Sequence, residues 1–110
     1  MELNEYQKKA LSTASHDDKY KIIYPALGLG NEAGEVLGKI KKWLRGDDGE
    51  GVLSEERRQG LKEELGDVLW YIAVLAHDLG LDLDDIAKVN VDKLQSRKQR
   101  GTLKGDGDKR

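Results

Sequence analysis

The chain has 110 residues, a length that suits one domain, which we expect over residues 1–110. Charged residues make up 36% of it, with a formal net charge of −2. It contains no cysteine, which excludes disulfides and thiolate metal sites. The nearly balanced charge argues against bulk attraction to nucleic acid, and we expect no nucleic-acid partner. No apolar run approaches the roughly 20 residues of a membrane span, and the first residues lack the basic and apolar regions of a signal peptide, so we expect a cytoplasmic protein with no membrane partner.

Apolar residues recur with helical spacing along the chain, and the sequence predicts an all-α fold. A first helix is expected over residues 2–14, followed over residues 15–24 by a connection with room for one helical turn. Pro25 suits the first turn of a second helix that runs to about Arg45. The glycine-rich, charged residues 46–51 are then expected to form a flexible loop.

Capping residues mark two further helices. Ser54 is a suitable N-cap for a third helix, and Gly80 is a suitable residue to terminate it. A fourth helix is expected to begin at a cap formed by Asp82 or Asp84 and to end at about Arg100. The sequence therefore predicts a bundle of four to five helices.

Residues 101–110 form a tail rich in glycine and aspartate, which is expected to be loosely ordered on its own. Separate helices in a chain of this length bury only a thin core. We therefore expect self-association, with the core of the bundle completed by dimerisation.

Two pairs of acidic residues lie three positions apart in the second and third predicted helices, namely Glu32 with Glu35 and Glu64 with Asp67. This spacing alone is uninformative, because a chain with 21 acidic residues contains about four such pairs by chance. On a helical wheel, however, each pair lies at the edge of an apolar stripe and not on the polar back of its helix. If the two stripes pack on each other, the four carboxylates converge.

Four converging carboxylates at a partly dry interface would repel one another and take up protons unless a cation lay among them. Oxygen ligands alone suit a hard divalent ion, so the sequence predicts a Mg²⁺ site, with Mn²⁺ as a possible substitute. The alternative is that basic side chains such as Lys39 and Lys62 pair with the acids instead.

Further residues suit the binding of a phosphorylated substrate. Lys39 and Tyr71 occupy matching positions beside the two acidic pairs, where either can contact a phosphate or a sugar, although Tyr71 equally suits the edge of the core. Asn90, Lys93 and Arg97 share one face of the fourth predicted helix. That face suits either a phosphate clamp or an ordinary solvated basic surface.

The aromatic residues and histidines allow a similar choice. Trp43 and Trp70 can stack on a base, but an aromatic side chain on a helix face is more often part of a core or a dimer interface. His16 and His77 are expected to be structural or exposed.

The arrangement Glu32-x-x-Glu35, then 28 residues, then Glu64-x-x-Asp67 resembles the metal-binding signature of the MazG-like nucleoside triphosphate pyrophosphohydrolases, in the all-α NTP pyrophosphatase superfamily. The segment Leu-Gly-Leu-Gly-Asn-Glu-Ala-Gly-Glu-Val around the first pair and the segment Glu-Glu-Leu-Gly-Asp-Val-Leu-Trp around the second are similar to that family as well. The pattern Asn-x-x-Lys-x-x-x-Arg of residues 90–97 resembles its final-helix motif.

The resemblance implies an all-α fold, a homodimer or dimer of dimers (a homotetramer), and Mg²⁺-dependent cleavage of a nucleoside triphosphate to the monophosphate and pyrophosphate, typical of nucleotide-pool house-cleaning. It implies that the metal ligands are Glu32, Glu35, Glu64 and Asp67. A carboxylate that the metal does not saturate can act as the general base, and Glu35 and Glu64 are the candidates.

Two alternatives remain at the level of the sequence. The first is a related enzyme of the same superfamily that acts on a phosphoribosyl nucleotide. The second is a helical dimer that binds Mg²⁺ or nucleotide without catalysis. The sequence leaves the preferred base and sugar open.

Overall fold

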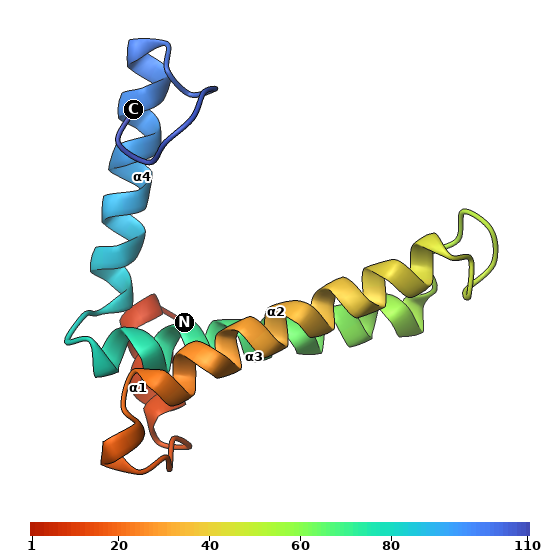
Figure 1. Cartoon of the computed structure of the whole chain (residues 1–110), viewed down its shortest axis with the longest axis horizontal. Helices are drawn as coiled ribbons and strands as arrows, with labels where there is room; N and C mark the ends of the chain where they lie inside the picture. Colours follow the sequence, from red (N-terminus) through yellow and green to blue (C-terminus); the bar gives the residue numbers. More distant parts are fainter.

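The computed structural model describes all 110 residues and contains helices only (Figure 1). In chain order these are α1 (Leu3–Leu11), the short 3-10 helix η1 (Asp18–Tyr20), α2 (Ile23–Leu44), α3 (Glu55–Asp78) and α4 (Leu83–Arg100). The predicted all-α fold is confirmed. None of these helices combines the length and the apolar character that crossing a membrane requires.

Local capping sets the boundaries of α3 and α4 close to the predicted ones. The Ser54 hydroxyl accepts a hydrogen bond from the Arg57 N–H at 3.0 Å, and the Asp82 carboxylate accepts one from the Asp85 N–H at 2.8 Å. Gly80 follows the end of α3 with a φ of 75°, a left-handed conformation that favours glycine.

The first helix is shorter than predicted. It ends at Leu11 and not at residue 14, because the hydroxyls of Ser12 and Thr13 donate hydrogen bonds to carbonyl oxygens of its last turn. The chain then leaves α1 and crosses to α2 through η1, the one helical turn for which the connection had room.

The small buried core lies where α1, α3 and α4 meet. The Gln7 side chain of α1, only 6% exposed, donates hydrogen bonds to the carbonyl oxygens of Ala73 and Leu81, each at 3.1 Å. Its own oxygen accepts a hydrogen bond from the Leu83 N–H at 3.2 Å. A single polar side chain therefore joins three helices and satisfies backbone groups that burial would otherwise leave unpaired.

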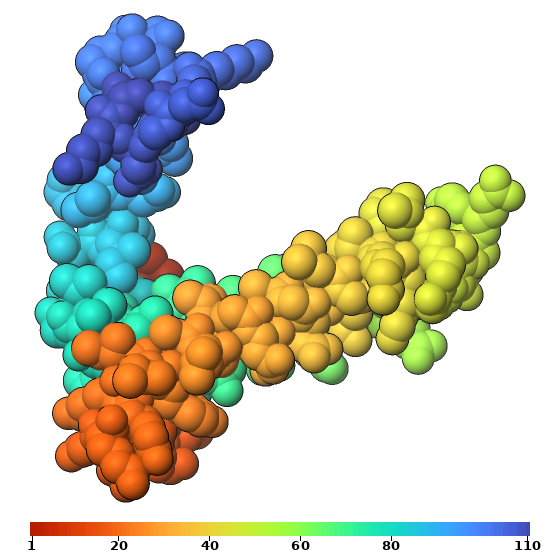
Figure 2. Space-filling view, viewed as in Figure 1, coloured from red at the N-terminus to blue at the C-terminus, as the bar shows by residue number.

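Helices α2 and α3 lie side by side as an antiparallel hairpin, and α4 leaves the end of α3 in another direction, so that the molecule has two arms (Figures 1 and 2). The radius of gyration is 17.1 Å, whereas a compact domain of this length has about 13 Å. Large apolar side chains are exposed on both arms, among them Leu37 and Leu65 on the hairpin and Val89 and Val91 on α4. One chain therefore leaves its apolar faces uncovered, and completion of the core by a second chain stays a prediction.

The loop between α2 and α3, which was expected to be flexible, is fastened by an ion pair. Both oxygens of Asp48 accept hydrogen bonds from the Arg57 guanidinium, at 2.7 and 3.1 Å, and one of them also accepts from the Ser54 hydroxyl at 3.1 Å. The hydrogen bonds from Arg57 are the main reason that the pKa of Asp48 falls to about 2.

This ion pair predicts an acid-sensitive part of the stability. Because the pKa of Asp48 in the folded chain lies below its usual value of about 3.9, its contribution is fully present above about pH 4 and is lost as the pH falls toward about 2. Asp48→Asn should therefore make the melting temperature fall less steeply with acid, measured by circular dichroism. Glu50→Gln, in the same loop, is the control and should follow the parent; an Asp48→Asn curve parallel to the parent's would contradict the prediction.

The C-terminal tail folds back along α4, whereas the sequence favoured a loosely ordered segment (Figure 1). The carboxylate of Asp108 pairs with Lys93 at 2.8 Å and with Arg97 at 3.2 Å, and Arg97 also donates to the Asp108 carbonyl oxygen. Arg110 donates to the carbonyl oxygens of Thr102 and Leu103. Opposite charges in the tail and the helix thus hold a segment whose glycines alone would favour disorder.

Candidate active site

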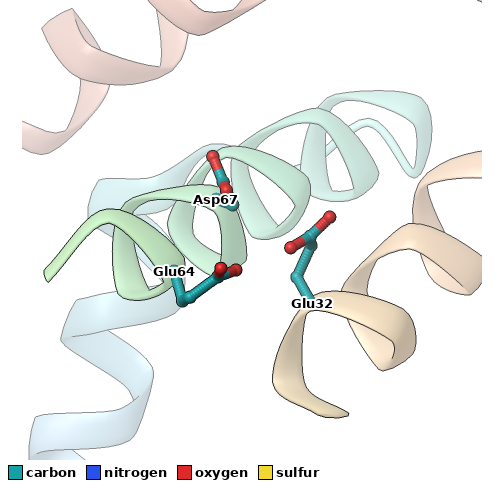
Figure 3. A group of neighbouring side chains, drawn as sticks. All are labelled: Glu32, Glu64 and Asp67. Atoms are coloured by element: carbon teal, nitrogen blue, oxygen red, sulfur yellow. The ribbon is translucent and has the colours of Figure 1, made fainter. Parts of the chain in front are cut away.

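Three carboxylates meet where α2 and α3 pack side by side (Figure 3). Glu32 comes from α2, and Glu64 and Asp67 come from adjacent turns of α3; each offers one oxygen, and these oxygens lie within 4.8 Å of one another. Glu32 and Glu64 are half-buried, whereas Asp67 is exposed. The convergence follows from the position of each acid at the edge of an apolar stripe, since the stripes pack on each other.

Glu35 lies outside this three-carboxylate cluster. It is one turn beyond Glu32 on α2, and its side chain is exposed. The negative charge of Glu35 nevertheless affects Glu32 in the cluster. The pKa of Glu32 is raised mainly by desolvation, then by a hydrogen bond with Glu64 and by the negative charges of Asp67, Glu64 and Glu35. The cluster therefore disfavours its own negative charge, which is the condition that a bound cation relieves.

The donor set fits a hard divalent cation. It consists of carboxylate oxygens only, which are the ligands that Mg²⁺ and Mn²⁺ prefer. The expectation that a basic side chain pairs with the acids holds for Lys39, whose Nζ forms an ion pair with Glu64 at 3.8 Å, a distance too long for a hydrogen bond. Lys62, the other basic partner considered from the sequence, forms no ion pair in the chain. Glu32, Glu64 and Asp67 are therefore the residues that would hold the ion.

Tyr71 borders the cluster, as its position on α3 predicts. The pKa of its phenol is raised first by a hydrogen bond with Tyr24, then by burial and by the negative charges of Glu32 and Asp67. The ring also occupies the space above Gly28 of α2, where an added Cβ would lie 2.1 Å from a ring carbon of Tyr71. Glycine at this position lets the aromatic ring lie directly on the α2 backbone.

Gly28→Ala is expected to destabilise the fold although alanine favours helices. The new methyl group must displace the Tyr71 ring, and such overpacking costs about 1–3 kcal/mol, more than the ~1 kcal/mol that alanine gains over glycine in a helix. Gly30→Ala, on the same helix with nothing within 4 Å of the added Cβ, is the control and should raise stability. Urea unfolding of both variants, at one protein concentration, measures the difference; equal effects would refute the packing argument.

The structure does not bring Asn90, Lys93 and Arg97 to the carboxylates within one chain. They lie on α4, the arm that points away from the hairpin (Figure 1). Asn90 is exposed, while Lys93 and Arg97 pair with Asp108 of the tail. Of the predicted substrate-binding residues, only Lys39 and Tyr71 therefore lie beside the cluster in one chain.

A buried polar pair that the sequence did not reveal supports the base of the hairpin. The Nε2 atom of His16 lies 2.9 Å from a carboxylate oxygen of Asp78, which also accepts a hydrogen bond from the Ile22 N–H at 2.9 Å. Burial opposes the charged form of Asp78, but these hydrogen bonds outweigh it and lower its pKa. The expectation that His16 is structural agrees with this contact. Its partner is 62 residues away, so no local pattern identifies it.

Comparison with known proteins identifies the family of the chain. The family model of the MazG nucleotide pyrophosphohydrolase domain matches residues 25–102, a range that includes every candidate site residue. Gene 37 protein of Mycobacterium phage L5 is 43% identical over an alignment of 116 positions that covers 100% of both chains. The uncharacterized protein YvdC of Bacillus subtilis (strain 168) is 36% identical over 73 residues, which cover 63% of this chain and 68% of that protein. No solved structure matches the chain.

The family match extends over more than half of the chain, and the relative from phage L5 is similar over its full length. Proteins of this family typically use a divalent metal ion, and the acidic cluster lies within the matched residues. The resemblance found in the acidic pairs is thereby confirmed: the chain belongs to the MazG nucleotide pyrophosphohydrolase family.

Proposed function

We propose that the chain is a Mg²⁺-dependent nucleoside triphosphate pyrophosphohydrolase, which releases a nucleoside monophosphate and pyrophosphate and serves in nucleotide-pool house-cleaning. The observation that carries the proposal is the meeting of Glu32, Glu64 and Asp67 at the seam of α2 and α3, in a chain of a nucleotide pyrophosphohydrolase family. Carboxylates gathered around a hard cation suit a substrate whose phosphates are themselves ligands for that cation.

The carboxylates then have distinct roles. Glu32, Glu64 and Asp67 would hold the ion, which would offset negative charge on the phosphate oxygens and lower the pKa of a bound water. Glu35 lies one turn away and outside the cluster, so its carboxylate remains free to accept a proton. We therefore assign Glu35 as the general base that takes the proton of the attacking water, and Glu64 as a ligand.

Lys39 and Tyr71 supply the remaining contacts from the same chain. The Lys39 ammonium, 3.8 Å from Glu64 and about one-third exposed, suits a phosphate oxygen at the seam. The Tyr71 phenol, beside Glu32 and Asp67, can donate a hydrogen bond to a phosphate or a sugar.

A second copy would complete the site. The exposed apolar side chains of the hairpin and of α4 favour association into a homodimer or a dimer of dimers. Because α4 points away from its own hairpin, Asn90, Lys93 and Arg97 would serve as a phosphate clamp for a neighbouring copy.

A substrate panel tests the proposal. Ribonucleoside and deoxyribonucleoside triphosphates are incubated with Mg²⁺, and the products are separated by chromatography. We expect monophosphate and pyrophosphate in equal amounts, with no diphosphate intermediate. If no nucleotide is cleaved, or if orthophosphate is the product, the proposed reaction is refuted; a phosphoribosyl nucleotide included in the panel tests the related activity.

A further inference from the structure

The tail after α4, residues 101–110, covers one member of the proposed phosphate clamp. Arg97 is only 4% exposed, and its guanidinium donates hydrogen bonds to the carbonyl oxygen of Asp108 and, at 3.2 Å, to the carboxylate of the same residue. The same carboxylate oxygen pairs with Lys93 at 2.8 Å. In the space-filling view the tail lies against the end of the α4 arm (Figure 2). While the tail holds this position, Arg97 is closed to a phosphate.

An arginine of the tail closes it into a loop. The guanidinium of Arg110 donates hydrogen bonds to the carbonyl oxygens of Thr102 at 3.1 Å, Leu103 at 2.9 Å and Gly107 at 2.6 Å. A segment with three glycines would otherwise sample many conformations. These hydrogen bonds join the last residues of the tail to its first, and the closed loop holds Asp108 against α4.

The contacts between the tail and α4 are of a kind that an anion in solution can displace. They consist of ion pairs and hydrogen bonds, and the side chain of Asp108 is 80% exposed. Leu103, the one large apolar residue of the tail, is 46% exposed and anchors nothing. Because ion pairs that solvent reaches contribute little to stability, the tail is held only weakly on the helix.

The carboxylate of Asp108 resembles the ligand for which the clamp is proposed. Hydrogen bonds from Lys93 and then from Arg97 lower its pKa, so a negatively charged oxygen rests on both cations. A phosphate offers the same oxygen chemistry with more oxygens and more charge, and it suits the bidentate grip of a guanidinium. A polyphosphate is therefore a stronger ligand for these two side chains than one carboxylate.

We propose that the tail is an autoinhibitory latch, in which Asp108 occupies Lys93 and Arg97 until the phosphates of a nucleotide displace it. This rests on the proposed function, which gives these two cations to the substrate. A site that is open for only part of the time binds its ligand with an affinity reduced by that fraction. The latch therefore favours polyphosphates, whose charge offsets the lost tail contacts, over anions of lower charge.

Asp108→Asn removes the charge of the latch and leaves Lys93 and Arg97 in place. KM for the best nucleotide of the panel, and the inhibition constant of inorganic tripolyphosphate, should both fall by roughly 3-fold or more, because the clamp is open for more of the time. Asp106→Asn, the same change at an exposed tail residue that forms no ion pair, is the control and should follow the parent. Arg110→Ala, which opens the loop, should act in the same direction as Asp108→Asn.

The mobility of the tail separates this inference from the proposed reaction. The chain has no cysteine, so Lys104→Cys accepts a single nitroxide label on the tail, whose electron paramagnetic resonance spectrum reports mobility. Inorganic tripolyphosphate should increase that mobility, whereas potassium chloride at the same ionic strength should not, and adding Asp108→Asn should give a mobile label without any ligand.

The outcomes of the two measurements are distinct. Release of the label by tripolyphosphate without turnover of any nucleotide would refute the reaction and support the latch. With turnover intact, a label that tripolyphosphate leaves equally mobile or less mobile would overturn the latch and leave the reaction standing. An equal or higher KM in Asp108→Asn would overturn it as well, and a higher one would mean that Asp108 orients the clamp.

Discussion

Glu64→Gln is expected to lower kcat/KM for the preferred nucleoside triphosphate by at least about 100-fold. The substitution keeps the size of the side chain but removes a negative charge and a metal ligand from the centre of the cluster, where Glu64 lies between Glu32 and the basic Lys39. Steady-state kinetics with Mg²⁺ in excess measure the effect. Glu55→Gln, the same chemical change at an exposed position of α3 outside the cluster, is the control and should retain the activity of the parent.

Metal binding supplies a second measurement that does not depend on turnover. Millimolar Mg²⁺ should raise the melting temperature of the parent and of Glu55→Gln, because an ion that binds only the folded chain stabilises it. Glu64→Gln should lose this rise. If Mg²⁺ shifts the Glu64→Gln and parent curves equally, or if Glu64→Gln retains full activity, Glu64 is not a ligand of the catalytic ion.

Asp78→Ala is expected to lower the free energy of unfolding by about 3 kcal/mol at pH 7, the usual cost of removing one partner of a buried pair. The Asp78 side chain is only 3% exposed and accepts hydrogen bonds from both His16 and the Ile22 N–H. Ile22 has a φ of 69°, an unfavourable conformation for a β-branched residue, and its N–H would lose its partner. Urea unfolding at one protein concentration gives the difference from the parent.

Two controls separate burial from charge. Asp92→Ala removes an exposed carboxylate paired with Lys88 on α4 and should change stability by no more than about 0.5 kcal/mol. Asp78→Asn keeps an acceptor for the Ile22 N–H and should lower the free energy of unfolding less than Asp78→Ala does.

The Asp78 pair also makes the stability depend on pH. Because the pKa of Asp78 is lowered in the folded chain, its charge stabilises the fold above the usual pKa range, and this contribution disappears as the pH falls through the lowered value. If Asp78→Ala and Asp92→Ala have equal free energies of unfolding, the buried Asp78 pair does not stabilise the fold more than an exposed pair does.

The starts of α3 and α4 show why helix boundaries were accessible from the sequence. Ser54 and Asp82 act on N–H groups three residues along the chain, so the residues that decide the boundary lie next to one another in the sequence. Gly80 marks an end for the same reason, since one residue adopts the left-handed conformation. The end of α1 differs from the prediction because the hydroxyls of Ser12 and Thr13 bond carbonyl oxygens of its last turn, a contact that apolar periodicity does not encode.

The composition of the acidic cluster could be predicted only in part. Helical periodicity places Glu32, Glu64 and Asp67 at the edges of apolar stripes, and the packing of α2 on α3 brings them together. The same periodicity places Glu35 at an edge, yet it remains outside, because its distance from α3 depends on how the two helices are rotated and shifted against each other. Periodicity specifies a face of a helix but not the register of its packing.

The sequence by itself determined the four long helices, the two acidic pairs at the edges of their apolar stripes and the family to which those pairs belong. Only the tertiary structure decided which carboxylates meet and that His16 pairs with Asp78. The physical reason is range: capping and amphipathicity act between residues up to four positions apart, whereas these contacts join residues tens of positions apart through the packing of α1, α2 and α3. For the carboxylate cluster, the sequence supplied its members and the packing of α2 on α3 selected the three that converge.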